Sequence, residues 1–154
     1  MNYWLMKTEP DVFSIDDLKE RGREPWDGVR NYEARNFMRD AMRPGDAVLF
    51  YHSNASPSAV VGIAEVGSDP YPDPTQFDES SDYYDAKATC AKPRWHMIEV
   101  AYVRHLARPV ALSEIKANAS LAEMALLKRS RLSVCPVKPE EFDEILRMAD
   151  EEQP

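Results

Sequence analysis

Residues 47–66 read AVLFYHSNASPSAVVGIAEV, and this stretch decides the fold class. Its first part, Ala47–Tyr51, is a short continuous apolar run, which is typical of a buried strand. Ala59–Val66 predicts a second strand, in which Gly62 marks a bulge or a close approach of another backbone. The two strands follow each other too closely for a regular parallel β-α-β array. The stretch therefore favours a mixed α+β fold built on a small curled sheet or barrel.

The other elements are predicted from alternation in the strands and from caps and apolar periodicity in the helices. Asn31–Met42 is the clearest helix, with Asn31 as its cap. Ser14 and Asp17 form a variant of the capping box at the start of an earlier helix. The remaining predicted elements are a strand at Tyr3–Thr8, a long loop at Asp69–Asp85, a strand at Trp95–Val103, short helices opening at Ser113 and at Ser120 (the second with a Ser120-to-Glu123 capping box), a strand at Leu132–Val134 and a terminal amphipathic helix at Pro139–Asp150. No internal repeat or low-complexity linker interrupts them, so residues 1–154 are expected to form a single domain.

Length and composition are those of an ordinary globular domain. The chain has 154 residues, of which 44% are hydrophobic and 30% charged, and its mean hydropathy is −0.55. No apolar run approaches the roughly 18–20 residues that a membrane span requires. Residues 1–7 lack the regions of a signal peptide, and Cys90 and Cys135 suggest a reducing compartment rather than a disulfide scaffold. We therefore expect a cytoplasmic protein with no membrane partner.

The net charge is −8 and the sequence pI is near 4.9, which disfavours strong non-specific binding to nucleic acid. The charges are unevenly spread, because residues 87–138 hold ten Lys or Arg against three acids, whereas residues 139–154 hold seven acids against one arginine. A basic middle beside an acidic end can form a localised positive face, which is the footprint of a nucleic-acid-binding protein. Charges scattered over a solvated surface explain the same counts. If the first interpretation holds, the acidic C-terminal helix should face away from the ligand.

Signals for catalysis are weak. The glycines never approach the spacing of a phosphate-binding loop. His52, His96 and His105 fit no paired-ligand spacing and the two cysteines stand alone, so the sequence supports neither a metal site nor a Cys–His nucleophile pair. Incidental histidines and small buried thiols explain these residues. We therefore expect no catalytic residues, no metal and no cofactor.

Polar and aromatic residues gather at the ends of predicted strands and at the starts of predicted helices. Such positions are rigid supports on which loops build sites. A flat nucleobase needs an aromatic or leucine face for stacking, together with amides, hydroxyls and backbone groups that read its edge. The segments that hold such residues are Lys7–Pro10, Trp26–Tyr32, His52–Asn54 and Lys128–Ser133. Core packing is the alternative explanation of Trp26, and an ordinary helix surface is the alternative for Tyr32 and Arg35. Trp4 and Trp95 are expected in the core.

The motifs, taken in order along the chain, are YWLMKTEP (residues 3–10), WDGVRNYEARNF (26–37), GD (45–46) followed by FYHSN (50–54), PDPT (72–75), and SRLSV (130–134) with PV (136–137). In this order they resemble the EVE domain family over about residues 3–145. The resemblance implies a PUA-like fold, a curled mixed β-sheet or barrel flanked by helices, similar to that of YTH and ASCH domains. It also implies a non-enzymatic reader of a modified base, such as methylated or hydroxymethylated cytosine, in DNA or in RNA.

The resemblance also implies roles for individual residues. Trp26 and Leu132 would be stacking surfaces, and Lys7 would be a polar or phosphate contact at the mouth of the pocket. Amides and hydroxyls would read the edge of a base that is flipped out of its strand. The residues expected to bind the ligand are Lys7, Trp26, Asn31, Tyr32, Arg35, Ser53, Asn54, Lys128, Arg131, Leu132 and Ser133, with Arg129 beside them on the approach.

Two other classes of function stay open at the level of sequence. One is a sensor of a free modified nucleoside or another small metabolite, which would fit the net acidity. The other is an enzyme acting on nucleic acid, or an accessory domain in RNA modification. A strand reader should lose affinity steeply as salt rises, whereas a nucleoside sensor should not. The choice of DNA or RNA, the modification, the oligomeric state and the role of loop 69–85 as a lid are not determined by the sequence.

Overall fold

The computed structural model describes residues 1–150. Its strands are β1 (Tyr3–Thr8), β2 (Arg23–Pro25), β3 (Ala47–His52), β4 (Ala59–Val66), β5 (Tyr71–Pro72), β6 (His96–Met97), β7 (Glu99–Ala111) and β8 (Val134–Val137). Six of them form one curled sheet in the order β2-β7-β4-β3-β1-β8, while β5 and β6 form a separate pair. Strands β1 and β3 run parallel and the other neighbours run antiparallel. The expected α+β fold, a curled mixed sheet flanked by helices, is confirmed.

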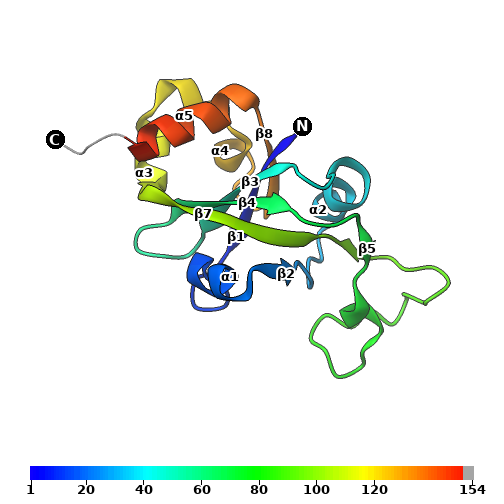
Figure 1. The fold of residues 1–154 in the computed structure, drawn as a ribbon. Coiled ribbons are helices and arrows are strands. Elements are labelled where there is room, and N and C mark those ends of the chain that lie inside the picture. Colours follow the sequence, from blue (N-terminus) through cyan, green and yellow to red (C-terminus); the bar gives the residue numbers. More distant parts are fainter. Residues whose placement is uncertain (151–154) are drawn as a thin grey trace.

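The helices pack on both sides of the sheet. They are α1 (Ile15–Arg21), α2 (Tyr32–Asn36) continued by the π-helical turn η1 (Phe37–Ala41), the 3-10 turn η2 (Pro74–Phe77), α3 (Leu112–Ala117), the 3-10 turn η3 (Ala119–Leu121), α4 (Ala125–Lys128) and α5 (Pro139–Asp150). Helices α3, α4 and α5 gather on one side, whereas α1 and β2 lie on the other (Figure 1). The long segment around β5 projects from one corner of the molecule (Figure 1).

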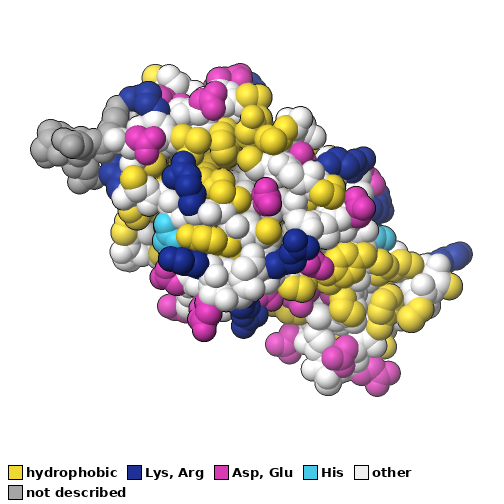
Figure 2. All heavy atoms as spheres, in the orientation of Figure 1, with side chains coloured by type: hydrophobic (Ala, Val, Ile, Leu, Met, Phe, Trp, Pro, Cys, Tyr) yellow, Lys and Arg dark blue, Asp and Glu magenta, His cyan; other side chains and the backbone are white. Residues whose placement is uncertain are grey.

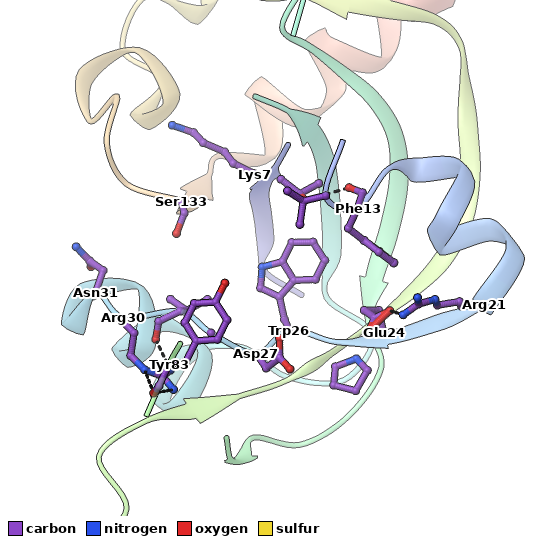
Figure 3. A pocket seen from close by; sticks show the side chains of 15 residues that line it. Lys7, Phe13, Arg21, Glu24, Trp26, Asp27, Arg30, Asn31, Tyr83 and Ser133 are labelled. Atoms are coloured by element: carbon purple, nitrogen blue, oxygen red, sulfur yellow. Dashed lines mark hydrogen bonds and ion pairs between the residues drawn. The ribbon is translucent and has the colours of Figure 1, made fainter. Parts of the chain in front are cut away.

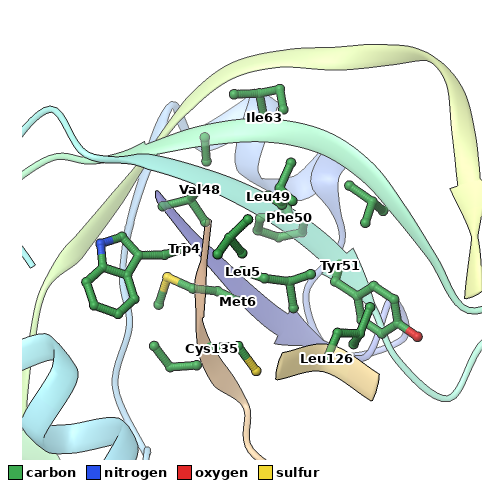
Figure 4. Close-up of a cluster of buried hydrophobic side chains, with 14 of the residues drawn as sticks. Trp4, Leu5, Met6, Val48, Leu49, Phe50, Tyr51, Ile63, Leu126 and Cys135 are labelled. Carbon is green, nitrogen blue, oxygen red and sulfur yellow. The ribbon is translucent and has the colours of Figure 1, made fainter. Parts of the chain in front are cut away.

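The central strands are apolar on both faces, which is why they lie in the middle of the sheet. In β3, the side chains of Val48, Leu49 and Phe50 are completely buried. Figure 4 shows how neighbouring strands and α4 add to this core, with Leu5 and Met6 from β1, Cys135 from β8 and Leu126 from α4. Burial on both faces explains the continuous apolar run that predicted this strand.

Two helix starts form as the sequence predicts. The Ser14 side chain accepts a hydrogen bond from the backbone N–H of Asp17, and the Asp17 carboxylate accepts one from the backbone N–H of Ser14, which completes the capping box. The Asn31 side chain accepts a hydrogen bond from the backbone N–H of Ala34 at 3.0 Å. These caps satisfy N–H groups that have no partner within the helix. Both caps fix the segments that flank the candidate site described below.

Gly62 lies both at a bulge and at a close approach of another backbone, the two alternatives predicted from the sequence. The pairing of β3 with β4 skips one residue, so that Phe50 lies opposite Gly62 and Tyr51 lies opposite Val60. A Cβ atom on Gly62 would lie 2.7 Å from the Ile15 Cδ1 atom and 2.9 Å from the Arg104 backbone oxygen. The residue therefore marks a β-bulge and a place where α1 and the backbone of the neighbouring strand β7 lie too close to β4 for any side chain.

Replacing Gly62 with alanine should lower the free energy of unfolding by about 1–3 kcal/mol, the usual cost of overpacking a close contact. Urea unfolding followed by circular dichroism measures this change. The double variant Ile15→Val/Gly62→Ala should lose less than the sum of the two single losses, because valine lacks the Cδ1 atom that the new methyl group meets. An unchanged unfolding midpoint in Gly62→Ala would contradict the packing seen here.

The strand predicted at Trp95–Val103 is wrong in its extent. The chain changes partner at Ile98, because β6 pairs with β5 whereas β7 pairs with β4 and β2. Trp95 precedes β6 and is buried, as expected, but it belongs to no strand. Periodicity along the sequence cannot reveal such a change of sheet, since it reflects the burial of each residue and not which strand it pairs with.

Four short elements also differ from the prediction. Helix α3 begins at Leu112, so Ser113 is not its cap. The predicted Ser120-to-Glu123 capping box is absent, because Asn118 caps this turn by accepting a hydrogen bond from the backbone N–H of Ser120. The late strand begins at Val134 rather than at Leu132, and β2 is not predicted at all. These elements are short and are held by tertiary pairing rather than by local propensity.

The charges do not form one broad basic face on the side of the molecule shown in Figure 2, where cations and acids are interspersed. Hydrophobic side chains gather there over the region of β5 and the segment that follows it (Figure 2). Within residues 1–150, no helix is long and apolar enough to cross a membrane. On this face, positive charge is therefore confined to small groups of side chains.

Candidate nucleic-acid interface

Three segments of the chain meet at one edge of the sheet. The parallel strands β1 and β3 end side by side, and the backbone N–H of Ser53 donates to the Thr8 carbonyl at 2.9 Å. Strand β8 is antiparallel to β1, so its beginning lies at the same edge, where the backbone N–H of Lys7 donates to the Ser133 carbonyl at 3.0 Å. Residues that follow β1 and β3 and residues that precede β8 therefore share one space.

A first cavity of about 510 Å³ lies at this edge. Its walls come from the end of β1, the turn before α1, residues 24–31 after and within β2, Tyr83 of the long loop and Ser133. Four of the residues expected from the sequence to bind a ligand, Lys7, Trp26, Asn31 and Ser133, line it together. Figure 3 shows that they approach the cavity from different elements.

Trp26 is both a core residue and a wall of the cavity. Its side chain is only 9% exposed, and its ring lies edge-on to Phe13 at 6.2 Å and to Phe50 at 5.8 Å between ring centroids. The nitrogen edge of the indole faces the space bordered by Ser133, Asn31 and Tyr83 (Figure 3). No residue among those the structure describes accepts a hydrogen bond from the indole N–H. Trp26 is thus a rigid aromatic wall that carries a free hydrogen-bond donor.

Tyr83 reaches the cavity because Gly28 has no side chain. Gly28 has φ of +77°, a conformation that L side chains rarely adopt, and a Cβ there would lie 2.7 Å from the Tyr83 ring. The Arg30 guanidinium donates to the Tyr83 carbonyl at 2.7 Å and lies 5.6 Å from the centre of its ring. The long loop therefore contributes a fixed aromatic wall to the cavity, although Tyr83 itself is 46% exposed.

Asp73 joins the two segments that form this wall. Its side chain is 1% exposed, and it accepts hydrogen bonds from the Gly28 backbone N–H at 2.8 Å and from the Arg30 guanidinium at 3.1 Å. It also accepts from the backbone N–H and the hydroxyl of Thr75. Burial alone would raise the pKa of Asp73, but these hydrogen bonds outweigh burial and hold the pKa below its usual value. Asp73 is therefore an ionised carboxylate that positions the cavity wall.

Two charged groups of the cavity have shifted pKa values. Burial lowers the pKa of the Lys7 amine, which donates a hydrogen bond to the Ser130 carbonyl at 2.9 Å. Desolvation raises the pKa of Asp27, and the nearby carboxylates of Asp73 and Glu24 raise it further. The Asp27 carboxylate makes no hydrogen bond to another side chain within residues 1–150. Charged groups with shifted pKa values in a cavity are typical of binding sites.

A second cavity, of about 550 Å³, adjoins the first and shares Lys7, Thr8 and Ser133 with it. Ser53, Asn54 and Arg131 from the expected set line this second cavity. The Asn54 amide donates to the Glu9 carboxylate at 2.6 Å, which fixes both side chains at its border. The residues expected to read a base edge are therefore divided between two neighbouring spaces.

A smaller third cavity of about 270 Å³ is lined by Asn31 and residues 129–132. Leu132 borders it but is only 4% exposed and packs in the core, so it offers little surface for stacking. Arg129 also borders it and is paired with Glu33. No residue of α5 lines any of these three cavities, in agreement with the expectation that the acidic helix faces away from the site.

Tyr32, Arg35 and Lys128 line none of the three cavities. Tyr32 instead stacks on Trp95 with 4.7 Å between ring centroids, and the Arg35 guanidinium lies 4.7 Å from the Tyr32 ring. Lys128 pairs with Glu123 at 3.6 Å. The expected site therefore consists of a cavity-lining part and a separate outer group of stacked planar side chains.

Sequence reasoning missed Asp27 and Tyr83 as parts of the first cavity. Asp27 lies within the WDGVRNY motif, so its place next to Trp26 was a usable signal. Tyr83 belongs to a loop of mixed composition, and nothing in the local sequence indicates that its ring packs over Gly28. Within residues 1–150, no group of three or more His, Cys, Asp or Glu side chains is placed to hold a metal ion.

The chain is similar to proteins of one family over almost its whole length. The family model described as EVE domain matches residues 2–148. Thymocyte nuclear protein 1 of Mus musculus is 42% identical over 170 residues, covering 98% of this chain and 75% of the mouse protein. A solved structure of a hypothetical protein from Leishmania major is 49% identical, with a TM-score of 0.94 and coverage of 100% of this chain and 98% of that chain.

A structure of human THYN1 protein in complex with 5-methylcytosine-containing DNA is 38% identical, with a TM-score of 0.94 and coverage of 99% of this chain and 100% of that chain. An ASCH protein from Zymomonas mobilis, at 11% identity and a TM-score of 0.53 over 96% of this chain and 99% of that chain, shares the fold alone. The PUA-like fold implied by the sequence motifs is therefore confirmed. The family model and these relatives together show that the chain belongs to the EVE domain family.

Proposed function

We propose that this protein binds a DNA strand that carries 5-methylcytosine and holds the modified base, flipped out of the strand, in the first cavity. The observation that carries the proposal is the cavity itself, which combines the rings of Trp26 and Tyr83 with unsatisfied polar groups at its border. The human relative of the same fold, crystallised with 5-methylcytosine-containing DNA, supports this choice of ligand.

The polar groups of the cavity complement the edge of cytosine. Cytosine presents an exocyclic amine, which donates, and a ring nitrogen and a carbonyl oxygen, which accept. The Asp27 carboxylate is an acceptor suited to the amine, as carboxylates commonly are for cytosine. The free indole N–H of Trp26 and the amide N–H₂ of Asn31, whose oxygen is used by the helix cap, are donors suited to the acceptors. Thymine and uracil carry a carbonyl where cytosine has its amine, so Asp27 would select against both.

The free energies expected for such a reader are a few kcal/mol each. Flipping a base out of a stack costs a few kcal/mol, which contacts in the cavity and along the strand offset. A single methyl group against an apolar wall changes the affinity by about 1–3 kcal/mol, or 10- to 200-fold. The rigid ring of Trp26, held by Phe13 and Phe50, and the ring of Tyr83 are the apolar surfaces available for that methyl group.

We propose binding without turnover. The lining of the first cavity includes no histidine and no cysteine, so the nucleophile pairs used in acyl and thiol chemistry are not assembled there. Two of its arginines hold other residues in place: Arg30 pairs with Asp73 and donates to the Tyr83 carbonyl, and Arg21 pairs with Glu24. Incubation with a methylated strand should return the strand unchanged, as judged by mass spectrometry.

A binding titration tests the proposed function. Matched DNA and RNA oligonucleotides, with cytosine, 5-methylcytosine, 5-hydroxymethylcytosine or methylated adenine at one position, are titrated at two salt concentrations. We expect the 5-methylcytosine DNA strand to bind most tightly. Tyr83→Ala should weaken this binding about tenfold, since loss of an aromatic stacking surface costs about 1–3 kcal/mol per base. Trp26→Ala should abolish the preference for the methylated strand.

Tyr84→Ala is the matched control, because Tyr84 is 41% exposed, is the next residue in the same loop and lines none of the cavities. Trp26→Ala also removes a core side chain, so the folded fraction of each variant is checked by circular dichroism before titration. Equal affinity of Tyr83→Ala and Tyr84→Ala, with no preference for any modified strand in the unaltered protein, would refute the reader. Binding of free 5-methyldeoxycytidine as tightly as the strand, without salt dependence, would favour a nucleoside sensor instead.

A further inference from the structure

The second cavity differs from the first in its charge. Three cations, Lys7, Lys116 and Arg131, line it, against one acid, Glu9. The Glu9 carboxylate is already engaged by the Asn54 amide at 2.6 Å. In a chain whose net charge is −8, this excess of positive charge at one hollow is a local feature rather than a property of the surface. The hollow is therefore suited to an anion.

Among these residues, Arg131 provides the strongest evidence for an anion site. The other arginines within residues 1–150 make hydrogen bonds or ion pairs through their guanidinium groups, for example Arg129 with Glu33 and Arg30 with Asp73. Arg131 makes none with any residue that the structure describes, and neither does the Lys116 amine. Both side chains are exposed at the cavity border. An arginine without an internal partner, next to a hollow, is free to take a phosphate with two parallel hydrogen bonds.

The neutral groups of the same cavity fit this chemistry. The hydroxyls of Ser53, Ser130 and Ser133 have no hydrogen-bond partner within residues 1–150 and border the hollow. Hydroxyl and cationic side chains are the groups that contact phosphate oxygens in complexes with nucleic acid. Ser53 follows β3 and Ser133 precedes β8, so the rigid edge of the sheet positions them.

The position of the second cavity links it to the first. Lys7, Thr8 and Ser133 form a common wall, so an anion in the second cavity lies next to a base in the first. We infer that the second cavity binds the phosphate attached to the nucleoside whose base occupies the first cavity. This inference rests on the proposed function, and it adds a phosphate site with Arg131 and Lys116 as its cations. In a strand the phosphate is a phosphodiester, and in a free nucleotide it is a terminal monoester.

A strand with an abasic residue distinguishes binding at the phosphate site from binding at the base site. A short single-stranded DNA with 5-methylcytosine at its centre, and the same strand with an abasic residue there, are titrated from low to moderate salt. Arg131→Gln should weaken the binding of both strands by the same factor, about tenfold at low salt, because it removes a charge-assisted contact to phosphate. It should also reduce the slope of log K against log salt by about 0.7, the value for one phosphate contact on a single strand.

Lys116→Gln should have a smaller effect of the same kind, because an ammonium group makes no paired contact. Arg104→Gln and Lys19→Gln are the matched controls, since both residues are exposed and line none of the cavities. Arg131 has no partner among residues 1–150, so its replacement removes no bond that the structure describes and the melting temperature should not change. Comparison of 5-methyldeoxycytidine with its 5′- and 3′-monophosphates shows which phosphate is bound and whether a monoester suffices.

Binding of the abasic strand by Arg131→Gln as tightly as by Arg104→Gln, at every salt concentration, would overturn the inference. If the unaltered protein still prefers the methylated strand in that case, the proposed function stands without this phosphate site. Conversely, if Arg131→Gln weakens both strands while methylation makes no difference, the phosphate site stands and the base reader fails. Failure of the protein to bind either strand at low salt would reject both.

Discussion

Replacing Asp73 with alanine should lower the free energy of unfolding by about 3–5 kcal/mol, the usual result of removing one partner of a buried ion pair. The residue is 1% exposed, and its carboxylate pairs with Arg30 at 3.1 Å. Its loss leaves the Arg30 guanidinium without its ionic partner, and it leaves the Gly28 backbone N–H and the backbone N–H of Thr75 without their acceptor. Urea unfolding of the variant and of the unaltered protein measures the difference.

The same variant should lose affinity for its ligand beyond what unfolding explains. Asp73 holds Gly28 and Arg30, and Arg30 in turn holds Tyr83 at the cavity. Under conditions where the variant is still folded, the Tyr83 wall should be displaced and the affinity for a methylated strand should approach that of Tyr83→Ala. Asp78→Ala is the control, because Asp78 is an exposed residue of the same loop that bonds only within its own turn. Equal stability of the two variants would contradict this role of Asp73.

The contribution of Asp73 should also depend on pH, with a sign that follows from its lowered pKa. Hydrogen bonds from Thr75, Gly28 and Arg30 outweigh burial, so the pKa of Asp73 in the folded protein lies below the value of about 3.9 in the unfolded chain. A carboxylate with a lowered pKa adds stability that is fully present above the unfolded pKa and is lost as pH falls through the folded pKa. The stability difference between the unaltered protein and Asp73→Ala should therefore shrink below about pH 4.

Asp46→Ala should have the second large effect, a loss of about 2–4 kcal/mol, because three donors lose a charged acceptor. Asp46 is 4% exposed and accepts hydrogen bonds from the indole N–H of Trp4 at 3.1 Å, from the Asn2 backbone N–H at 3.1 Å and from the Arg43 backbone N–H at 3.0 Å. It thus ties the start of β1 to the turn before β3. Thermal unfolding measures the loss, and near-ultraviolet circular dichroism reports changes in aromatic packing, to which Trp4 contributes.

Asp40→Ala is the matched control for Asp46→Ala. Asp40 is exposed and pairs with its neighbour Arg39 on the surface of the π-helical turn η1, where an ion pair contributes about 0–1 kcal/mol. The two variants remove the same charge from nearby positions, so their difference isolates burial and the three hydrogen bonds. A loss in Asp46→Ala no larger than that in Asp40→Ala would show that the buried acceptor is not needed.

Much of the secondary structure could be predicted from the sequence. The bounds of β1, β4 and α5, and the caps at Ser14 and Asn31, agree with the structure because their signals are local. A cap depends on residues three positions apart, and a strand on alternation over a few residues. The prediction failed where pairing with another strand determines whether a strand forms and where it ends, as at β2 and at the break between β6 and β7. Such pairings join residues far apart in the chain and leave no periodic trace.

The candidate site was predictable in part for the same reason. Lys7 and Asn31 stand at the ends of elements with strong local signals, and they converge on the first cavity with Trp26 and Ser133. The strands next to Trp26 and Ser133 are short and are held by tertiary pairing. Tyr32 carries the same kind of side chain, but its position on α2 directs its ring to Trp95. Whether such a side chain lines the cavity or packs elsewhere depends on the side of the helix that carries it and on the neighbouring loops, rather than on residue type.

Local signals in the sequence are enough to predict the mixed fold, its capped helices, and the polar and aromatic residues placed at the ends of its elements. Which of these residues meet depends on tertiary pairing. The parallel pairing of β1 with β3 and the antiparallel pairing of β8 bring Lys7, Ser53 and Ser133 to one edge, and the missing side chain of Gly28 admits Tyr83. Capping and strand alternation depend on residues that are a few positions apart in the sequence. A cavity is formed instead by packing between segments that are far apart in the sequence.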